Sequence, residues 1–163
     1  MFQEIAHNMS IQQCLTAEVA AMSELASLLK SEQSALADGD MDALSETTSG
    51  KTVLLRKIAE LEKVRTTKMT ALGFNGKPEG MKDYFTQSTD DTEYCAMLWE
   101  KLLSISEQAK EDNRTNGLLI NRRLSQNQTA LNVLGRGGST GSLYGPTGQA
   151  TVNTGSMKGM VPR

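Results

Sequence analysis

The feature that most constrains this chain is a 41-residue segment, residues 94–134, which contains no proline and repeats its apolar residues at one helical period. Steps of three or four residues from Tyr94 reach a series of mostly apolar positions: Leu98, Leu102, Ile105, Ala109, Asn113, Asn116, Ile120, Leu124, Asn127, Leu131 and Leu134. The mean step is close to the ~3.6 residues of a helical turn, so these positions lie along one side of a single helix. At ~1.5 Å per residue, this helix would be about 60 Å long.

The second half of this segment differs from the first, because asparagines at positions 113, 116 and 127 interrupt the apolar series. Gly117 lies beside them, and a glycine within a helix costs about 1 kcal/mol relative to alanine. Amides at apolar positions need hydrogen-bonding partners if they are buried. We therefore interpret the second half as a binding surface for a partner, and its pattern suits an amphipathic helix of another protein.

Charge divides the chain in a similar place, because the last acidic residue is Asp112. Residues 113–163 carry six basic residues and no acid, whereas residues 1–112 carry 11 bases and 19 acids. Two explanations stay open. Acids near the start of a helix and bases near its end complement the helix dipole, or the basic final third attracts an acidic partner surface.

The remaining composition favours one soluble, all-α domain followed by a tail. Only 4% of the 163 residues are aromatic, which argues for aliphatic helix packing. No apolar run approaches the ~18 residues of a membrane span, and residues 1–10 lack the pattern of a signal peptide, so we expect a cytoplasmic protein. Cys14 and Cys95 have no second Cys or His at ligand spacing. Buried free thiols are favoured, with a disulfide or a metal site as the alternatives.

Two further long helices precede the central segment. Residues 2–37 contain neither Gly nor Pro and predict a first helix whose core face is Ile11, Leu15, Val19, Met22, Ala26, Leu29 and Leu36. Asp38, Gly39 and Asp40 predict a tight turn, so the next helix should be an antiparallel neighbour. That helix is expected over residues 41–72, ended by Gly73, with its core face formed by Leu44, Leu54, Leu55, Ile58, Leu61, Val64 and Leu72.

Residues 74–89 are predicted to form a connection with one helical turn at 81–85. Asp90 with Glu93 resembles a capping box, so the third helix is expected to begin there. The predicted fold is all-α, an elongated antiparallel three-helix bundle over residues 1–134 without a sheet. Gly135 should end the third helix, because eight of the 14 glycines and two of the three prolines follow residue 134. Residues 135–163 are expected to be a disordered, Gly-rich tail.

Residues 143–149 stand out in that tail, since Leu143 and Tyr144 precede a Gly-Pro turn. They are typical of a short docking motif, although an aromatic residue without a role in a linker is the alternative.

The sequence contains little that supports a catalytic site. His7 is the only histidine, the glycines at 135–138 follow a helix and do not precede one, and the arginines are too sparse for a nucleic-acid face. The carboxylates Glu100, Glu107, Glu111 and Asp112 read as a solvated face. We expect no enzyme, cofactor or metal.

The third helix carries a recognisable pattern. Asn113-x-x-Asn116-Gly117-x-Leu119-Ile120, followed by Leu124, Ala130-Leu131 and Leu134, resembles the signature helix of the FlgN family of flagellar export chaperones. The turn at residues 36–44, followed by Lys51 and Leu54-Leu55, is similar to the first interhelical junction of that family. Residues 143–149 resemble the family's tail motif, with Thr147 where an acidic residue is expected. The resemblance covers roughly residues 23–149.

This resemblance implies a cytoplasmic chaperone that binds the C-terminal helical segments of the two hook-filament junction proteins. It would prevent their early assembly and present them to the membrane export gate, without a cofactor, as a monomer or small oligomer. The substrate surface implied is Asn113, Asn116, Gly117, Ile120, Leu124, Asn127 and Leu131, and Tyr144 would dock on the cytosolic domain of the gate. The alternative is a structural coiled-coil subunit that self-assembles through the third-helix seam.

Overall fold

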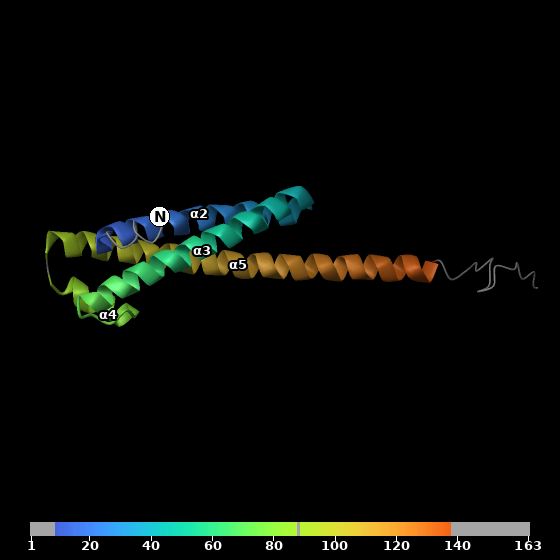
Figure 1. Ribbon diagram of the computed structural model, residues 1–163. Helices are drawn as coiled ribbons and strands as arrows, with labels where there is room; N and C mark the ends of the chain where they lie inside the picture. Colours follow the sequence, from blue (N-terminus) through green and yellow to red (C-terminus); the bar gives the residue numbers. More distant parts are fainter. Residues whose placement is uncertain (1–8, 88, 138–163) are drawn as a thin grey trace, which may run out of the picture. The chain divides into compact units, whose positions relative to one another are not determined.

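The computed structural model describes residues 9–87 and 89–137, and the regular structure in these residues is helical. It comprises α2 (Ile11–Asp38), α3 (Met41–Ala71), α4 (Pro78–Phe85) and α5 (Asp90–Gly137), shown in Figure 1. The predicted all-α helical bundle is therefore confirmed. The expectations for His7, for residues 2–8 of the first helix and for the tail motif at 143–149 lie outside the described residues.

The chain divides into two compact units, Met1–Asn121 and Arg122–Arg163. We call the first the bundle unit and the second the C-terminal unit, and each is described by itself. Of the C-terminal unit, residues 122–137 are described, all within α5. The boundary between bundle and tail expected after residue 134 stays a prediction.

Helix α2 begins at Ile11 because Ser10 caps it. The Ser10 backbone is extended (φ −73°, ψ 166°), its hydroxyl accepts a hydrogen bond from the Gln13 amide (3.2 Å), and Gln13 Oε1 accepts from the Ser10 amide (2.8 Å). The prediction of one uninterrupted helix over residues 2–37 is wrong at this point. At the other end the predicted tight turn is confirmed. Gly39 adopts φ 76°, and Asp40 Oδ1 caps α3 by accepting from the Ala43 amide (3.0 Å).

Helix α3 returns antiparallel to α2 and ends at Ala71, with Leu72 as its C-cap. Gly73 follows in the left-handed conformation (φ 86°), and the Phe74 amide donates to the Met69 carbonyl (2.9 Å). Two residues predicted for its core, Leu55 and Leu72, are exposed. Leu54 points toward the apolar cluster. Leu55 is the next residue, so it points about 100° further around the helix and is exposed. Leu72 lies at the helix end.

The connection to the last helix contains more helix than the single turn predicted. Pro78 starts α4, Met81 is buried, and Tyr84 contacts the rings of Phe74 (5.6 Å between centroids) and Phe85 (5.9 Å) edge-on. Gly80 is required here, because a Cβ atom would lie 1.7 Å from the Asn75 carbonyl oxygen. Met81 belongs to the apolar core, and the half-buried Phe74, Tyr84 and Phe85 pack against it.

Helix α5 begins with a cap formed by Thr89 and Thr92. The Thr89 amide donates to Thr92 Oγ1 (2.8 Å), and the Thr92 amide donates to Thr89 Oγ1 (3.3 Å). The predicted pairing of Asp90 with Glu93 is therefore wrong by one position. The predicted end at Gly135 is also wrong, because α5 continues to Gly137. A glycine weakens a helix without having to end it, and among the described glycines only Gly39 and Gly73 have positive φ.

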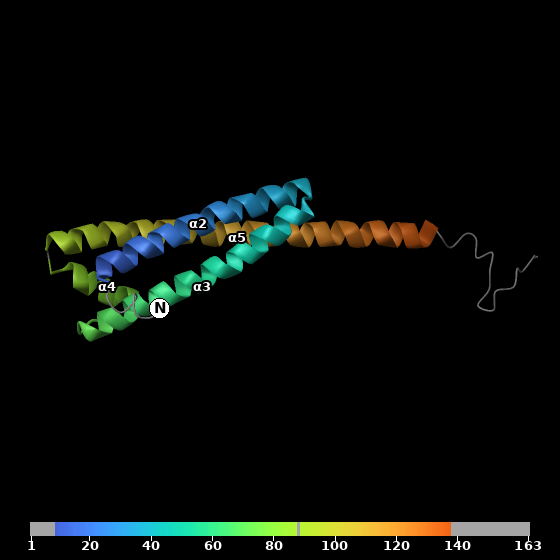
Figure 2. The same cartoon turned by 45° about the horizontal axis from the view of Figure 1, so that its top comes forward.

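The bundle unit packs two apolar clusters, and the half-buried Met22 contacts both. Figure 2 shows the hairpin of α2 and α3 beside the first part of α5. The main cluster joins the start of α2 to the start of α5, with Met69 and Met81 between them: Ile11, Leu15, Val19, Met69, Met81, Cys95, Leu98, Trp99 and Leu102. Cys14 and Cys95 are both buried free thiols, which confirms the favoured prediction. Burial raises the pKa of each thiol, so neither is poised as a nucleophile.

Candidate partner-binding surface on helix α5

Up to Asn116, one face of α5 is covered by the rest of the bundle unit. Cys95, Leu98, Leu102 and Ala109 are buried at steps of three, four and seven residues along this face. Asn116 is only 1% exposed, and no residue described after it is buried. The coverage of the repeating face of α5 therefore stops at Asn116.

A buried ion pair ties the three long helices together near Trp99. Arg65 of α3 donates through Nε to both carboxylate oxygens of Glu18 on α2, at 2.8 and 3.1 Å. Its guanidinium carbon lies 4.8 Å from the ring centre of Trp99 on α5. Burial raises the pKa of Glu18, and the adjacent Arg65 charge opposes that shift. The arrangement is structural, since both charged side chains are enclosed.

Asn116 belongs to a second polar cluster, at the point where coverage of α5 stops. Its Nδ2 group donates to the Leu29 carbonyl (2.9 Å) and to Glu32 Oε2 (2.8 Å), both on α2. Lys51 of α3 completes the cluster by donating to Glu32 Oε1 (2.7 Å). The amide nitrogen of Asn116 is thus occupied within its own bundle. The side chain is buried, so it does not lie on the exposed substrate surface that the sequence predicted for it.

A third contact joins the same regions of α2 and α5. Lys30 Nζ donates to Asp112 Oδ1 (2.6 Å), and Gln108 Nε2 donates to the same oxygen (3.1 Å). Both hydrogen bonds lower the pKa of the Asp112 carboxyl, and the bond from Lys30 has the larger effect. The prediction of a solvated acidic face is therefore wrong for Asp112, which is enclosed. Glu111, by contrast, is exposed and pairs with Arg114 one turn further along (2.7 Å).

The other residues predicted for the substrate surface are accessible to different degrees. In the bundle unit Asn113 is exposed, Ile120 is 41% exposed, and Gly117 is half-buried with no atom within 4 Å of where a Cβ would lie. In the C-terminal unit Asn127 is exposed, and Leu124 and Leu131 are 60% and 68% exposed. Tyr144 lies outside the described residues.

The family model described as "FlgN protein" matches residues 1–151. The chain belongs to the FlgN family. The resemblance seen in the third helix is thereby confirmed, and the chain has a role in flagellum synthesis.

Individual FlgN proteins agree with this assignment. The flagella synthesis protein FlgN of Proteus mirabilis is 27% identical over 142 residues, which is 86% of this chain and 89% of that protein. A crystal structure described as a flagella synthesis protein FlgN from Pseudomonas aeruginosa covers 74% of this chain and 92% of its own, at 21% identity and a TM-score of 0.59. At that identity, the second similarity concerns the fold alone.

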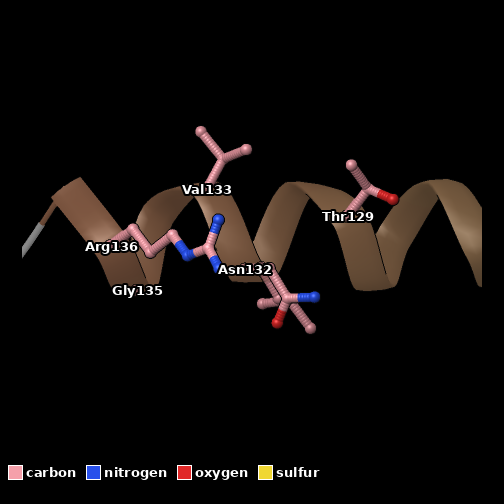
Figure 3. A pocket seen from close by; sticks show the side chains of 6 residues that line it. Thr129, Asn132, Val133, Gly135 and Arg136 are labelled. Atoms are coloured by element: carbon pink, nitrogen blue, oxygen red, sulfur yellow. The ribbon is translucent and has the colours of Figure 1, made fainter.

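A hollow along the last turns of α5 in this FlgN chain offers no ligand site. About 560 Å³ of space is lined by Thr129, Leu131, Asn132, Val133, Gly135 and Arg136, all from α5. Figure 3 shows Val133 and Thr129 on one side of the helix and Asn132 on the other, so these side chains do not converge. Across residues 9–87 and 89–137 no cluster of three or more His, Cys, Asp or Glu could hold a metal. No helix in those ranges is long and apolar enough to cross a membrane.

The prediction from the residues alone missed two buried carboxylates of the bundle unit. Glu18 and Glu32 lie on the apolar face of α2, three residues after Leu15 and Leu29. That spacing was a usable signal, because a carboxylate within an apolar stripe needs a partner on another helix. The identity of those partners depended on how the helices pack.

Proposed function

We propose that this protein is a cytoplasmic flagellar export chaperone that binds the C-terminal helical segments of the hook-filament junction proteins. In this role it keeps those segments from assembling early and delivers them to the export gate. Tyr144 is proposed to dock on the cytosolic domain of the gate. Membership of the FlgN family supports the flagellar setting, and the residues of α5 support the mode of binding.

The observation that carries this proposal is that the apolar period of α5 continues after its coverage stops. Ile120 in the bundle unit, and Leu124 and Leu131 in the C-terminal unit, keep the three- and four-residue spacing and are exposed. Such a series matches the anchor positions that hold an amphipathic helix. A protein segment that must fold as it binds loses ordering entropy, so the complex has moderate affinity and can release its cargo at the gate.

The substrate surface is proposed to comprise Asn113, Gly117, Ile120, Leu124, Asn127 and Leu131. Asn116 has a supporting role, because its amide holds α5 against α2. Exposed amides such as Asn127 cost little in the free chaperone and can pair with polar groups of a bound helix, which fixes its register.

Substitution of Ile120 tests the surface. Ile120→Asp should abolish binding of a junction-protein C-terminal peptide in calorimetry, because a carboxylate would have to be desolvated against that peptide. The far-ultraviolet circular dichroism should stay near wild type. Leu118→Asp is the matched control: Leu118 is also exposed on α5 but lies about 160° away around the helix, so binding should persist. Unchanged affinity of the Ile120 variant would refute the surface.

The gate-docking role is tested separately. Tyr144→Ala should leave peptide binding intact and weaken only binding to the cytosolic domain of the export gate. A loss of both activities would show that the two functions are not separable.

Light scattering distinguishes the structural alternative, since a chaperone stays a monomer or small oligomer and binds one peptide. A self-assembling coiled-coil subunit would instead form large, concentration-dependent species.

A further inference from the structure

The bundle unit contains an Asn-Gly dipeptide in each of two very different surroundings. Asn116-Gly117 lies within α5, where Asn116 is buried and its Nδ2 group donates to α2. Asn75-Gly76 lies between α3 and α4, outside any helix, and Asn75 is exposed. The side-chain carbonyl of an asparagine can be attacked by the backbone nitrogen that follows it, and glycine hinders this attack least because it has no Cβ atom. The surroundings therefore decide which pair can react.

The turn between α3 and α4 brings the reacting groups of Asn75-Gly76 together. Asn75 Oδ1 accepts a hydrogen bond from the Lys77 amide (3.0 Å), which directs the side chain toward the backbone that follows it. The same donor stabilises the negative charge that develops on Oδ1 when the side-chain carbonyl is attacked. Within the part of the chain that the structure describes, the Gly76 amide donates to no acceptor, so its nitrogen is available. The Gly117 amide is instead committed to the hydrogen bonding of α5.

We propose that Asn75 is a site of spontaneous deamidation. The Gly76 nitrogen attacks Asn75 Cγ, so that an N–Cγ bond forms, the Cγ–Nδ2 bond breaks, and the Gly76 amide proton leaves with Nδ2 as ammonia. Water then opens the cyclic imide. Opening at Cγ gives aspartate, and opening at the main-chain carbonyl gives isoaspartate, whose backbone runs through the former side chain. Neither step is a redox reaction, and neither depends on the proposed function.

The isoaspartyl product affects α4, because its backbone is longer by a methylene group. The turn is too tightly packed to accept this group: a Cβ atom on Gly80 would lie 1.7 Å from the Asn75 carbonyl oxygen, and one on Gly76 would lie 2.3 Å from Thr66 Cγ2. Helix α4 contributes the fully enclosed Met81 to the core. Isoaspartate therefore displaces α4 from the core, whereas aspartate keeps the backbone and changes only the charge.

Incubation of the full-length protein in mildly alkaline buffer tests the site. Peptide mapping by mass spectrometry, with fragmentation that distinguishes isoaspartate from aspartate, follows Asn75 and Asn116 in the same sample. Asn75 should lose its amide at least about tenfold faster, because Asn116 can react only when α5 opens locally. Asn75→Gln is the matched control, since its longer side chain would have to close a larger ring. This variant should keep its amide.

Hydrogen exchange measures the effect on α4. Protein in which isoaspartate has accumulated should exchange its amides over residues 78–85 at least roughly tenfold faster than fresh protein. Freshly purified Asn75→Asp should retain the protection of wild type, because it carries the new charge without the longer backbone. Loss of protection in this variant would show that charge alone displaces α4, and would refute the role of the backbone.

The remaining outcomes also decide the proposal. Equal rates at Asn75 and Asn116 would overturn it, since the reaction would then depend on unfolding and not on the turn. An Asn75 amide that is stable in the folded protein and is lost only in urea would show that the turn protects it, which is equally fatal. Unchanged protection of α4 in the isoaspartyl form would refute the displacement. Selective loss at Asn75, followed by exposure of α4, supports both steps.

Discussion

The stretches of α5 before and after Gly117 share one helical period and differ in what surrounds it. Between Cys95 and Asn116 most of the repeating face is covered by α2, α3 and α4, and the buried amide of Asn116 is bonded to α2, whereas Asn113 is exposed. From Ile120 onward the repeating face carries aliphatic side chains of the same size as the buried Leu98 and Leu102, but these side chains are exposed. A periodic pattern therefore identifies the apolar side of a helix, without showing whether other helices of the same chain cover it.

The asparagines of α5 show the same difference at the level of single residues. Asn116 and Asn127 both interrupt the apolar series. Asn116 donates two hydrogen bonds to α2 and fixes where α5 lies against the bundle, whereas Asn127 is exposed. One amide is thus part of the folded structure, and the other is available for recognition. Measurements of stability and binding should separate them.

The largest effect should come from placing a charge on each stretch in turn. Leu102→Asp puts a carboxylate at a core position that is 5% exposed, and we expect the protein not to fold cooperatively. Leu131→Asp, on the same helix, should leave the free energy of unfolding within about 0.5 kcal/mol of wild type. Urea denaturation followed by circular dichroism measures both. A large destabilisation by Leu131→Asp would show that its stretch of α5 is covered within the free protein.

The next effect concerns Arg65, which contacts Trp99 in the covered stretch of α5 and Glu18 on α2. Arg65→Met leaves Glu18 buried without its cation and should lower the free energy of unfolding by about 3–5 kcal/mol. Adding Glu18→Leu should restore much of that loss, because a buried ion pair can be replaced by apolar side chains of similar size. If the double variant is as unstable as the single one, the Trp99 contact, and not the unpaired carboxylate, explains the cost.

Much of this architecture could be predicted from the sequence, because it depends on local signals. The absence of Pro, the helical spacing and the Asp-Gly-Asp turn at residues 38–40 were sufficient for three long helices and their first connection. Two helix starts were misplaced although their capping residues were present. Ser10 precedes Gln13, and Thr89 precedes Thr92, but neither pair interrupts a run of apolar residues clearly enough to stand out.

The candidate site could be predicted only in outline. The stripe on α5 follows from spacing, but whether a member is covered depends on how far α2 and α3 extend beside it. Asn116 and Ile120 are four residues apart on one face, yet one is enclosed and the other is accessible. The amide of Asn116 found its acceptors on a helix more than eighty residues earlier in the chain. Local sequence carries no record of such a contact.

Truncating the asparagines separately should give a smaller effect than the loss of Arg65. Asn116→Ala removes the donor to the Leu29 carbonyl and to Glu32, and it should destabilise the protein by about 1–3 kcal/mol. Asn127→Ala should change stability by no more than about 0.5 kcal/mol and weaken peptide binding instead. If Asn116→Ala proved neutral, the two buried hydrogen bonds would be worth no more than the exposed amide, and the distinction between the two asparagines would fail.

The smallest effect is a dependence on pH, and its sign distinguishes two buried carboxylates. Lys30 lowers the pKa of Asp112, so the stabilising contribution of this residue is present above its ordinary value of 3.8 and is lost as pH falls through the lowered pKa. Burial raises the pKa of Glu18, so its contribution is most favourable below its ordinary value of 4.5 and declines as pH rises through the raised pKa.

Comparison of wild type with Asp112→Asn and with Glu18→Gln isolates these contributions, because neither amide titrates. Measured by urea denaturation between about pH 3 and 7, the two differences in unfolding free energy should slope in opposite directions. Acid would then weaken the Lys30–Asp112 contact, which lies one turn before Asn116, while leaving the Glu18 region intact. Parallel slopes would contradict this, and they would mean that the ion pair with Arg65 outweighs the burial of Glu18. The covered stretch of α5 would then respond to acid uniformly along its length.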